Sequence, residues 1–201
     1  MITPRKYDLL KDLGSRRELT ASLPTAGGAG GGLSWGLVTS LPSAPAVGDT
    51  CIYKADATNG VFWQLVYDGV GGTPWKAMGP GALFARDNGQ SSRTSNVYGD
   101  LAAGATPAIV LPLAGDYVVQ FGARVVNGPE SQDIFMSVSS ADTEAVKWWY
   151  DSGHSHTTGS TSVKRTGLAA AATIAAKYRT AAGGACTWEQ RWLAVTPIRV
   201  G

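Results

Sequence analysis

Short strand-like segments, rather than helical periodicities, dominate residues 81–201 of this 201-residue chain. Each segment is rich in β-branched and aromatic residues, and clusters of Gly, Pro, Asn, Asp and Ser separate it from the next. Many short strands with turn signals between them are typical of a β-sandwich. The predicted strands are residues 82–86, 108–113, 116–126, 133–140, 145–151, 160–165, 172–180 and 185–200.

The Ala-rich residues 168–176 are the one segment in this region with the propensity of a helix. Thr173, Ile174 and Tyr178 are strand-like, and glycines bracket a segment of strand length. We therefore predict a strand here as well.

The composition excludes several classes of protein. Only 16% of the residues are charged, too few for the heptads of a coiled coil, and the 44% hydrophobic content argues against disorder. The net charge of +2 gives no electrostatic reason to expect a nucleic-acid partner. No stretch approaches the roughly 20 apolar residues of a membrane helix, and residues 1–11 do not lead into the apolar core of a secretion signal. We expect neither nucleic-acid binding nor membrane insertion.

Residues 41–84 are predicted to form a small three-stranded β module. The Asn59-Gly60 pair is the strongest hairpin signal in the chain. Trp63, Tyr67 and Trp75 lie in the segments that follow it and would supply most of the module's core. A core of this size is too small to stand alone.

Residues 1–40 are predicted to be an N-terminal anchor and a Gly-rich linker. Tyr7, Leu10 and Leu13 recur at three-residue spacing, which suits one face of a short helix. Such a helix is not stable alone. The segment is therefore either a frayed tail or an attachment segment that becomes ordered on binding a partner. The glycines of residues 26–36 favour a flexible hinge, with a close-packed glycine segment as the alternative.

The sequence shows no catalytic motif, and we do not expect an enzyme. It contains no G-x-S-x-G, no H-E-x-x-H and no Walker loop. Paired carboxylates occur at Asp142 and Glu144 and at Glu130 and Asp133. Asp142 and Glu144 would project to the same side of a strand, which permits the proximity of a glycosidase pair, but the turn residues before them favour a solvated loop. Cys51 and Cys186 match no metal or C-x-x-C spacing, which favours two buried thiols and leaves a disulfide between them open.

His154 and His156 are the best candidates for a functional site among the predicted loops. In an extended segment, residues i and i+2 project to the same side, so the two imidazoles would lie together. Exposed loop histidines, a ligand contact and a pH-sensitive interface are all consistent with this pattern.

The run Trp148-Trp149-Tyr150 is the densest aromatic segment. Alternation would place Trp148 and Tyr150 on one face of a strand and Trp149 on the other. One face would fill the core, and the other would meet solvent, a neighbouring subunit or a sugar. Trp188 and Trp192, four residues apart in the last segment, would share one face, which favours the core for both.

Residues 41–84 also carry an ordered set of motifs: an LP-x-x-P-x-x-G entry, an aspartate-containing strand, a W-x-L-x-Y strand and a closing segment from a Trp to a Gly-Pro pair. The residues concerned are Leu41, Pro42, Pro45, Gly48, Asp56, Trp63, Leu65, Tyr67, Trp75, Gly79, Pro80 and Leu83. The set resembles a small module that is common in structural proteins of tailed bacteriophages. It departs from the usual pattern at Met78, where a second Gly is commoner.

The rest of the chain is similar to the domain that usually follows this module. Pro112, Gly115 and Tyr117 form a Pro-x-x-Gly-x-Tyr opening, and a Tyr-Arg strand and residues 197–201 close the chain. The layout resembles the jelly rolls of the tumour-necrosis-factor and complement-C1q type, which generally assemble as trimers. It implies an all-β chain in which residues 85–201 form a jelly-roll head.

The resemblance implies a structural protein of a tailed-phage virion: a tail fibre, a head spike or a capsid decoration protein. It would attach to other virion proteins through residues 1–40 and project a homotrimeric head toward a host-surface glycan or protein. A stand-alone C1q-like module that binds carbohydrate or protein is the alternative.

A trimer would also offer a metal site. Trimeric phage fibres and spikes use His-x-His pairs on their axis, and three copies of His154 and His156 would present six imidazoles there. This number suits an octahedral shell around iron or a similar divalent metal. No other cofactor is implied.

Overall fold

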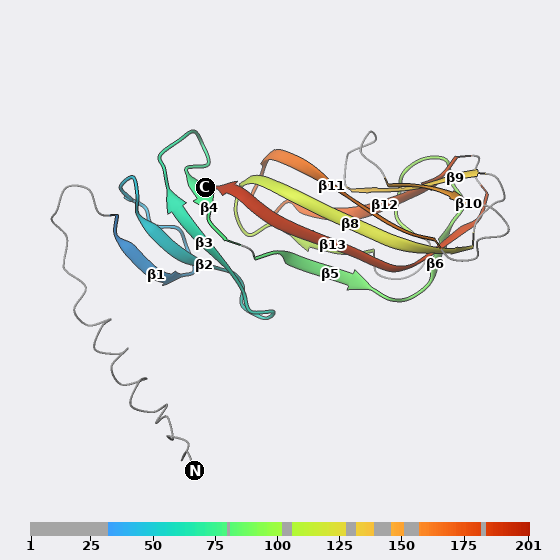
Figure 1. The fold of residues 1–201 in the computed structure, drawn as a ribbon, viewed down its shortest axis with the longest axis horizontal. Coiled ribbons are helices and arrows are strands. Elements are labelled where there is room, and N and C mark those ends of the chain that lie inside the picture. The colour runs from blue at the N-terminus through green and yellow to red at the C-terminus, as the bar shows by residue number, and fades with distance from the viewer. Residues whose placement is uncertain are drawn as a thin grey trace, which may run out of the picture. The chain divides into compact units, whose positions relative to one another are not determined.

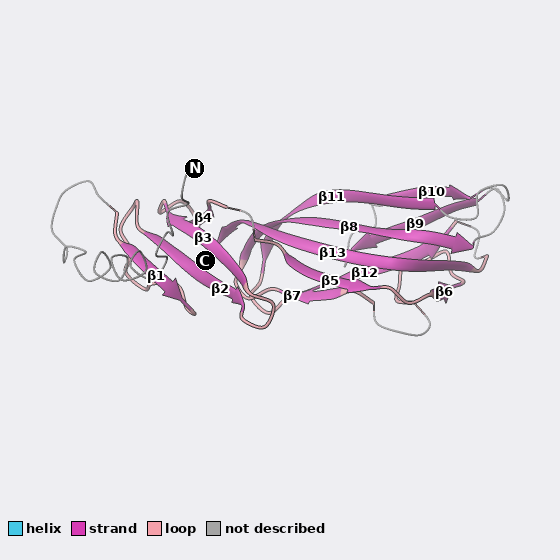
Figure 2. Cartoon of the chain, turned by 60° about the horizontal axis from the view of Figure 1, so that its bottom comes forward, coloured by secondary structure: helices cyan, strands magenta, loops and turns pink. Residues whose placement is uncertain are grey.

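In a computed structural model, residues 32–79, 81–101, 106–127, 132–138, 146–150, 157–181 and 184–201 are described. Their regular structure consists of strands alone (Figure 2). None of these residues belongs to a helix with the length and apolarity needed to cross a bilayer. The all-β fold class is therefore confirmed for the described part of the chain.

The strands are β1 (Ser34–Val38), β2 (Thr50–Asp56), β3 (Val61–Tyr67), β4 (Trp75–Ala77), β5 (Leu83–Asp87), β6 (Ser91–Arg93), β7 (Ala108–Val110), β8 (Gly115–Asn127), β9 (Gln132–Val138), β10 (Val146–Tyr150), β11 (Thr157–Leu168), β12 (Thr173–Thr180) and β13 (Cys186–Val200). Each of the eight segments predicted in residues 81–201 overlaps one of these strands. In the Ala-rich segment the strand begins at Thr173, after a turn that includes Ala171 with a φ of 61°. The three-residue strand β6 was not predicted.

The long strand β13 organises a nine-stranded sheet (Figure 1). Along one edge β13 pairs with β8, and β8 pairs with β11. Along its other edge β13 pairs in succession with β6, β5 and β4. Through β4 the sheet continues into β3, β2 and β1, so one hydrogen-bonded sheet spans from β1 to β11.

A second, four-stranded sheet in the order β10-β9-β12-β7 packs against the first. The inward residues of β8, such as Val119 and Phe121, alternate with outward ones and are fully buried. Ile134 and Met136 of β9 are buried in the same core. The ring of Tyr178 on β12 lies 5.2 Å from that of Trp188 on β13, which joins the two sheets through the core. Two sheets with one apolar layer between them make a sandwich.

The predicted hairpin is confirmed. Strands β2 and β3 pair antiparallel, and Gly60 in the turn between them has a φ of 66°. The Asp56 carboxylate accepts hydrogen bonds from the backbone N–H groups of Thr58 and Asn59 at 2.9 and 3.1 Å. Its other oxygen accepts one from the Asn59 side chain at 2.7 Å. These bonds fix the turn.

The core predicted for the small module continues into the sandwich. Trp63 and Trp75 are buried, and Tyr67 packs partly buried against them, as expected. The Trp63 ring lies 6.1 Å from that of Tyr117 on β8, and its Nε1 donates to the Gly81 carbonyl at 2.6 Å. Residues 32–201 accordingly form one compact unit with one contiguous core.

Strand β1 occupies residues for which the sequence indicated a flexible hinge. It pairs parallel with β2, and the buried Asp49 carboxylate fixes it there. That carboxylate accepts hydrogen bonds from the N–H of Leu33 at 2.6 Å, the N–H of Ala46 at 2.9 Å and the Trp35 indole at 3.3 Å. A Cβ at Gly32 would lie 1.8 Å from the Gly48 carbonyl oxygen, so this approach of two backbones needs glycine.

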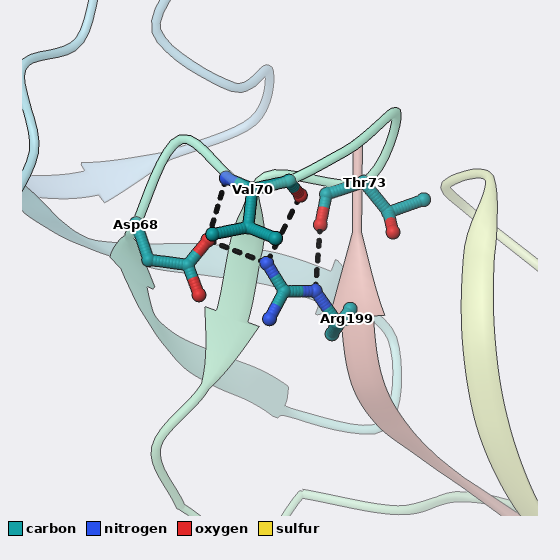
Figure 3. A network of polar contacts seen from close by, with 4 residues as sticks. All are labelled: Asp68, Val70, Thr73 and Arg199. Atoms are coloured by element: carbon teal, nitrogen blue, oxygen red, sulfur yellow. Dashed lines mark hydrogen bonds and ion pairs between the residues drawn. The ribbon is translucent and has the colours of Figure 1, made fainter.

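Arg199 near the end of β13 holds the loop that follows β3 (Figure 3). Its Nη2 donates to the Asp68 carboxylate and, at 3.1 Å, to the Val70 carbonyl. Its Nε donates to the Thr73 carbonyl at 3.1 Å. The Asp68 carboxylate also accepts from the Val70 N–H at 3.0 Å. This network ties the chain's last strand to the loop between β3 and β4.

Candidate functional site

Several predicted site residues lie outside the described residues. These are His154 and His156 and the anchor residues Tyr7, Leu10 and Leu13. Among the residues that the structure describes, no group of three or more His, Cys, Asp or Glu side chains could hold a metal ion. The axial metal and the anchor face therefore stay predictions.

The aromatic run Trp148-Trp149-Tyr150 belongs to β10, the first strand in the order of the four-stranded sheet. The backbone register pairs Trp148 with Ile134 and Trp149 with Asp133. The predicted strand is thus present. The interface and sugar-binding roles assigned to its side chains stay predictions.

The two cysteines are free and buried, as the sequence favoured, and they do not form a disulfide. Burial raises the pKa of the Cys51 thiol to about 11 and that of the Cys186 thiol to about 12. Because the thiolate is the form that reacts and binds metals, neither residue supplies a nucleophile near neutral pH.

A β-bulge in β13 reverses the predicted role of one tryptophan. The pairing with β8 advances by three residues from Glu189 to Trp192, while the partner advances by two from Arg124 to Gly122. The extra residue is Gln190, whose φ of 47° is rare for a residue with a side chain. Strict alternation would place Trp192 on the same face as Trp188, but the additional residue shifts the phase.

Trp188 is fully buried in the core, whereas Trp192 lies on the opposite, outer face of the nine-stranded sheet. The prediction that both indoles fill the core is therefore wrong for Trp192. A bulge changes the period of a strand by one residue, and the sequence carries no Gly or Pro at that point to reveal it.

On this outer face, Trp192 stacks with Phe84 from β5. Their ring centroids are 6.5 Å apart with an interplanar angle of 22°, and Phe84 is 57% exposed. Trp192 lies over its cross-strand partner Gly122, where an added Cβ would come within 2.9 Å of the indole Nε1. Gly122 therefore provides the flat surface that lets the indole lie against the sheet.

Polar side chains surround the two rings and form what we call the outer-face groove, a hollow of about 320 Å³. Arg86 is the direct cross-strand neighbour of Trp192, and Thr158 is that of Arg124. The strained backbone of the bulge brings Gln190 to the same hollow. The groove is lined by Phe84, Arg86, Arg124, Thr158, Gln190 and Trp192.

The groove carries one uncompensated positive charge. Arg124 Nη1 lies 3.0 Å from a Glu189 carboxylate oxygen, and Gln90 donates to the other oxygen at 3.0 Å. Arg86 is exposed and has no hydrogen-bond or ion-pair partner among the described residues. Its guanidinium is consequently available to a ligand.

A buried ion pair stabilises the strand that supplies Phe84 and Arg86. The Arg191 side chain is 1% exposed, and its Nη2 lies 2.7 Å from the Asp87 carboxylate at the end of β5. The same nitrogen donates to the Gly89 carbonyl at 3.1 Å. Sequence reasoning missed Arg191, because strict alternation with Trp188 and Trp192 in the core places Arg191 on the solvent face until the bulge is known.

A larger hollow of about 460 Å³ lies between the β2–β3 turn and β7. Its lining is mostly Ala, Leu, Ile and Val, and the carboxylate of Asp56 is already used within the turn. Asp56 and Asn59, the two polar side chains of its lining, bond to each other within the turn, whereas the specificity of a binding site comes from polar groups that are directed at the ligand. The outer-face groove is therefore the better candidate for a functional site.

Searches of protein-family models and of curated proteins gave no match to this chain.

Proposed function

We propose that this chain is a structural, non-enzymatic component of a tailed-phage virion: a fibre, spike or decoration protein. It attaches to other virion proteins through residues 1–40 and projects a homotrimeric jelly-roll head. The outer-face groove is the surface with which that head contacts the host.

The observation that carries this proposal is the joint between the module and the sandwich. Trp63 and Tyr117, which belong to the two resembling segments, pack together in one core. The Tyr117 hydroxyl also donates to the Leu113 carbonyl at 2.6 Å, which gives the Pro-x-x-Gly-x-Tyr opening a folding role. Residues of the module and of the following domain thus pack in one core. This supports the resemblance to a phage protein in which the module is followed by a jelly-roll domain.

Support for a trimer comes from the outer face of β1–β3. Leu37, Ile52 and Phe62 are 60%, 44% and 41% exposed, and Leu37 is the cross-strand neighbour of Ile52. Exposed apolar side chains that cluster in this way mark interfaces. A closed homo-oligomer would bury the face against the same strands of other copies.

The first test is the solution mass of the full-length chain by light scattering, with metal content measured on the same sample. We expect a mass near three times 20.9 kDa. About one metal ion per trimer would support His154 and His156 on the axis. A monodisperse monomer would contradict the trimer and the axial metal together.

Attachment is tested by deleting residues 1–31, which leaves β1 and its hydrogen bonds to Asp49 in place. We expect the shortened chain to remain a trimer and to fail to incorporate into phage particles. A shortened chain that still incorporates would show that residues 1–31 are not the attachment segment.

A stand-alone C1q-like binding module is the second candidate, and the outer-face groove favours it equally. It predicts that the full-length chain is soluble without a partner and that removal of residues 1–31 changes neither the binding of a ligand nor the location of the protein. Detection of the chain in purified particles would decide against it.

A further inference from the structure

We infer that the outer-face groove binds an acidic sugar, a pyranose ring with a carboxylate, through stacking on Phe84 and Trp192 and an ion pair with Arg86. The inference rests on the proposed binding role of the head. It does not depend on where the protein sits in a virion.

The two aromatic rings are the feature that indicates a sugar ligand. One face of a pyranose presents C–H groups, which pack against the electron-rich face of an aromatic ring. Phe84 and Trp192 stack with their ring centroids 6.5 Å apart and nearly parallel planes, and Phe84 is 57% exposed, so an aromatic face is open to a pyranose. The hollow of about 320 Å³ lies at the small end of the range for ligand sites.

The polar groups account for the hydroxyls. Thr158 and Gln190 line the groove and each can both donate and accept hydrogen bonds. In the neighbouring cross-strand row, Ser160 pairs with Gly122 beneath the indole of Trp192. An apolar surface bordered by uncharged donors and acceptors matches an amphipathic ligand with many hydroxyl groups.

The bulge indicates that this arrangement is maintained for binding. Backbone strain at a residue with a positive φ is a cost to folding, and such residues concentrate at functional sites. Here the strained residue is Gln190, and its side chain reaches the groove. A regular strand would avoid this free-energy cost but would not bring the Gln190 side chain to the groove.

Arg86 accounts for the negative charge. Arg124 already has a carboxylate partner in Glu189, whereas Arg86 has none among the described residues. A planar guanidinium binds a carboxylate through two parallel hydrogen bonds and also stacks on aromatic rings. Arg86 is the direct neighbour of Trp192, so both interactions can be made with one sugar residue.

The test measures binding of matched sugars to the full-length chain by titration of tryptophan fluorescence, with calorimetry as a second readout. The pairs are galacturonate and galactose tetrasaccharides, mannuronate and mannose tetrasaccharides, and sialyllactose and lactose. We expect at least one acidic sugar to bind about 10-fold or more tightly than its neutral partner, the scale of one charge-assisted hydrogen bond.

Three variants separate the contributions. Arg86→Gln should abolish the preference for the acidic sugar and leave the weak binding of the neutral one unchanged. Trp192→Ala should abolish both. Lys164→Gln removes an exposed cation outside the groove and should change neither.

Equal binding of acidic and neutral sugars, or a preference that survives Arg86→Gln, would overturn the assignment of a carboxylate. No binding of any of the six sugars would overturn the sugar site itself, including the case in which another copy of the chain covers the groove. The light-scattering mass is independent of these titrations, so failure of the sugar site and failure of the proposed trimer can be told apart.

Discussion

A single buried carboxylate determines whether β1 belongs to the sheet. The side chain of Asp49 is nearly inaccessible and receives three hydrogen bonds, two of which come from residues 33 and 35. The hydrogen bonds from the N–H groups of Ala46 and Leu33 lower the pKa of the Asp49 carboxyl below 3.8. The charged form is therefore the one that holds the N-terminal end of the described chain.

The substitution Asp49→Asn should destabilise the protein at neutral pH and destabilise it less in acid. Because the folded pKa is lowered, the stabilisation is fully present above the ordinary pKa of a carboxyl and is lost as the pH falls through the folded value. Chemical denaturation at pH 7 and at pH 3 measures the difference between variant and wild type, which should shrink in acid.

The control is Asp100→Asn, which removes a carboxylate that is 63% exposed and paired with Lys177. Exposed ion pairs contribute little to the free energy of unfolding. The denaturation midpoint of Asp100→Asn should therefore stay close to that of the wild type at both pH values. A difference for Asp49→Asn that is the same at pH 7 and pH 3 would contradict the role of the charge.

At the scale of elements, alternation and turn residues predicted most strands, because those signals are local. The hairpin at Asn59-Gly60 and the strand from Thr173 needed nothing more than the sequence. Strand β1 could not be predicted in this way, since its stabilising partner Asp49 lies 16 positions from Leu33. The bulge at Gln190 could not either, and with it the outer-face position of Trp192 stayed hidden.

Deletion of Gln190 should leave the fold intact. Trp188 and Glu189 before the bulge, and Trp192 to Pro197 after it, pair residue by residue with β8, so removing the extra residue joins these two stretches in one regular ladder. Relief of a positive φ removes a cost of about 1–3 kcal/mol, and we expect an equal or higher free energy of unfolding. The variant should bind sugar more weakly, because the groove loses a polar side chain.

Denaturant unfolding and the sugar titration check the two halves of this prediction. Gln190→Gly is the matched control, since it tolerates the positive φ and keeps the bulge. Should the deletion variant be unstable while Gln190→Gly is stable, the bulge would have a structural role in the twist of β13.

At the scale of the whole molecule, the outer face of β1–β3 should control assembly. Ile52→Lys places a charge among the exposed apolar side chains, and because Ile52 is 44% exposed the fold of one chain should be little affected. We expect light scattering over a range of concentrations to show dissociation to monomers. Val97→Lys, at an apolar residue that is 66% exposed in a loop, is the control and should remain a trimer. A trimeric Ile52→Lys variant would place the interface on another face.

Because the module and the sandwich share one core, we expect them to unfold together, whereas two separate domains would unfold independently. If Trp63 joins both parts, Trp63→Ala should lower the free energy of unfolding of residues 32–201 as a whole, by about 3–5 kcal/mol. The methyl signals of Leu65 in β3 and Met136 in β9, both fully buried, report the two parts separately by NMR. We expect both signals to disappear in one transition at a lower denaturant concentration than in the wild type, because a continuous sheet and core unfold together. A shift of the Leu65 transition alone would mean that the module unfolds independently, and that the contact between Trp63 and Tyr117 transmits little stability to the sandwich.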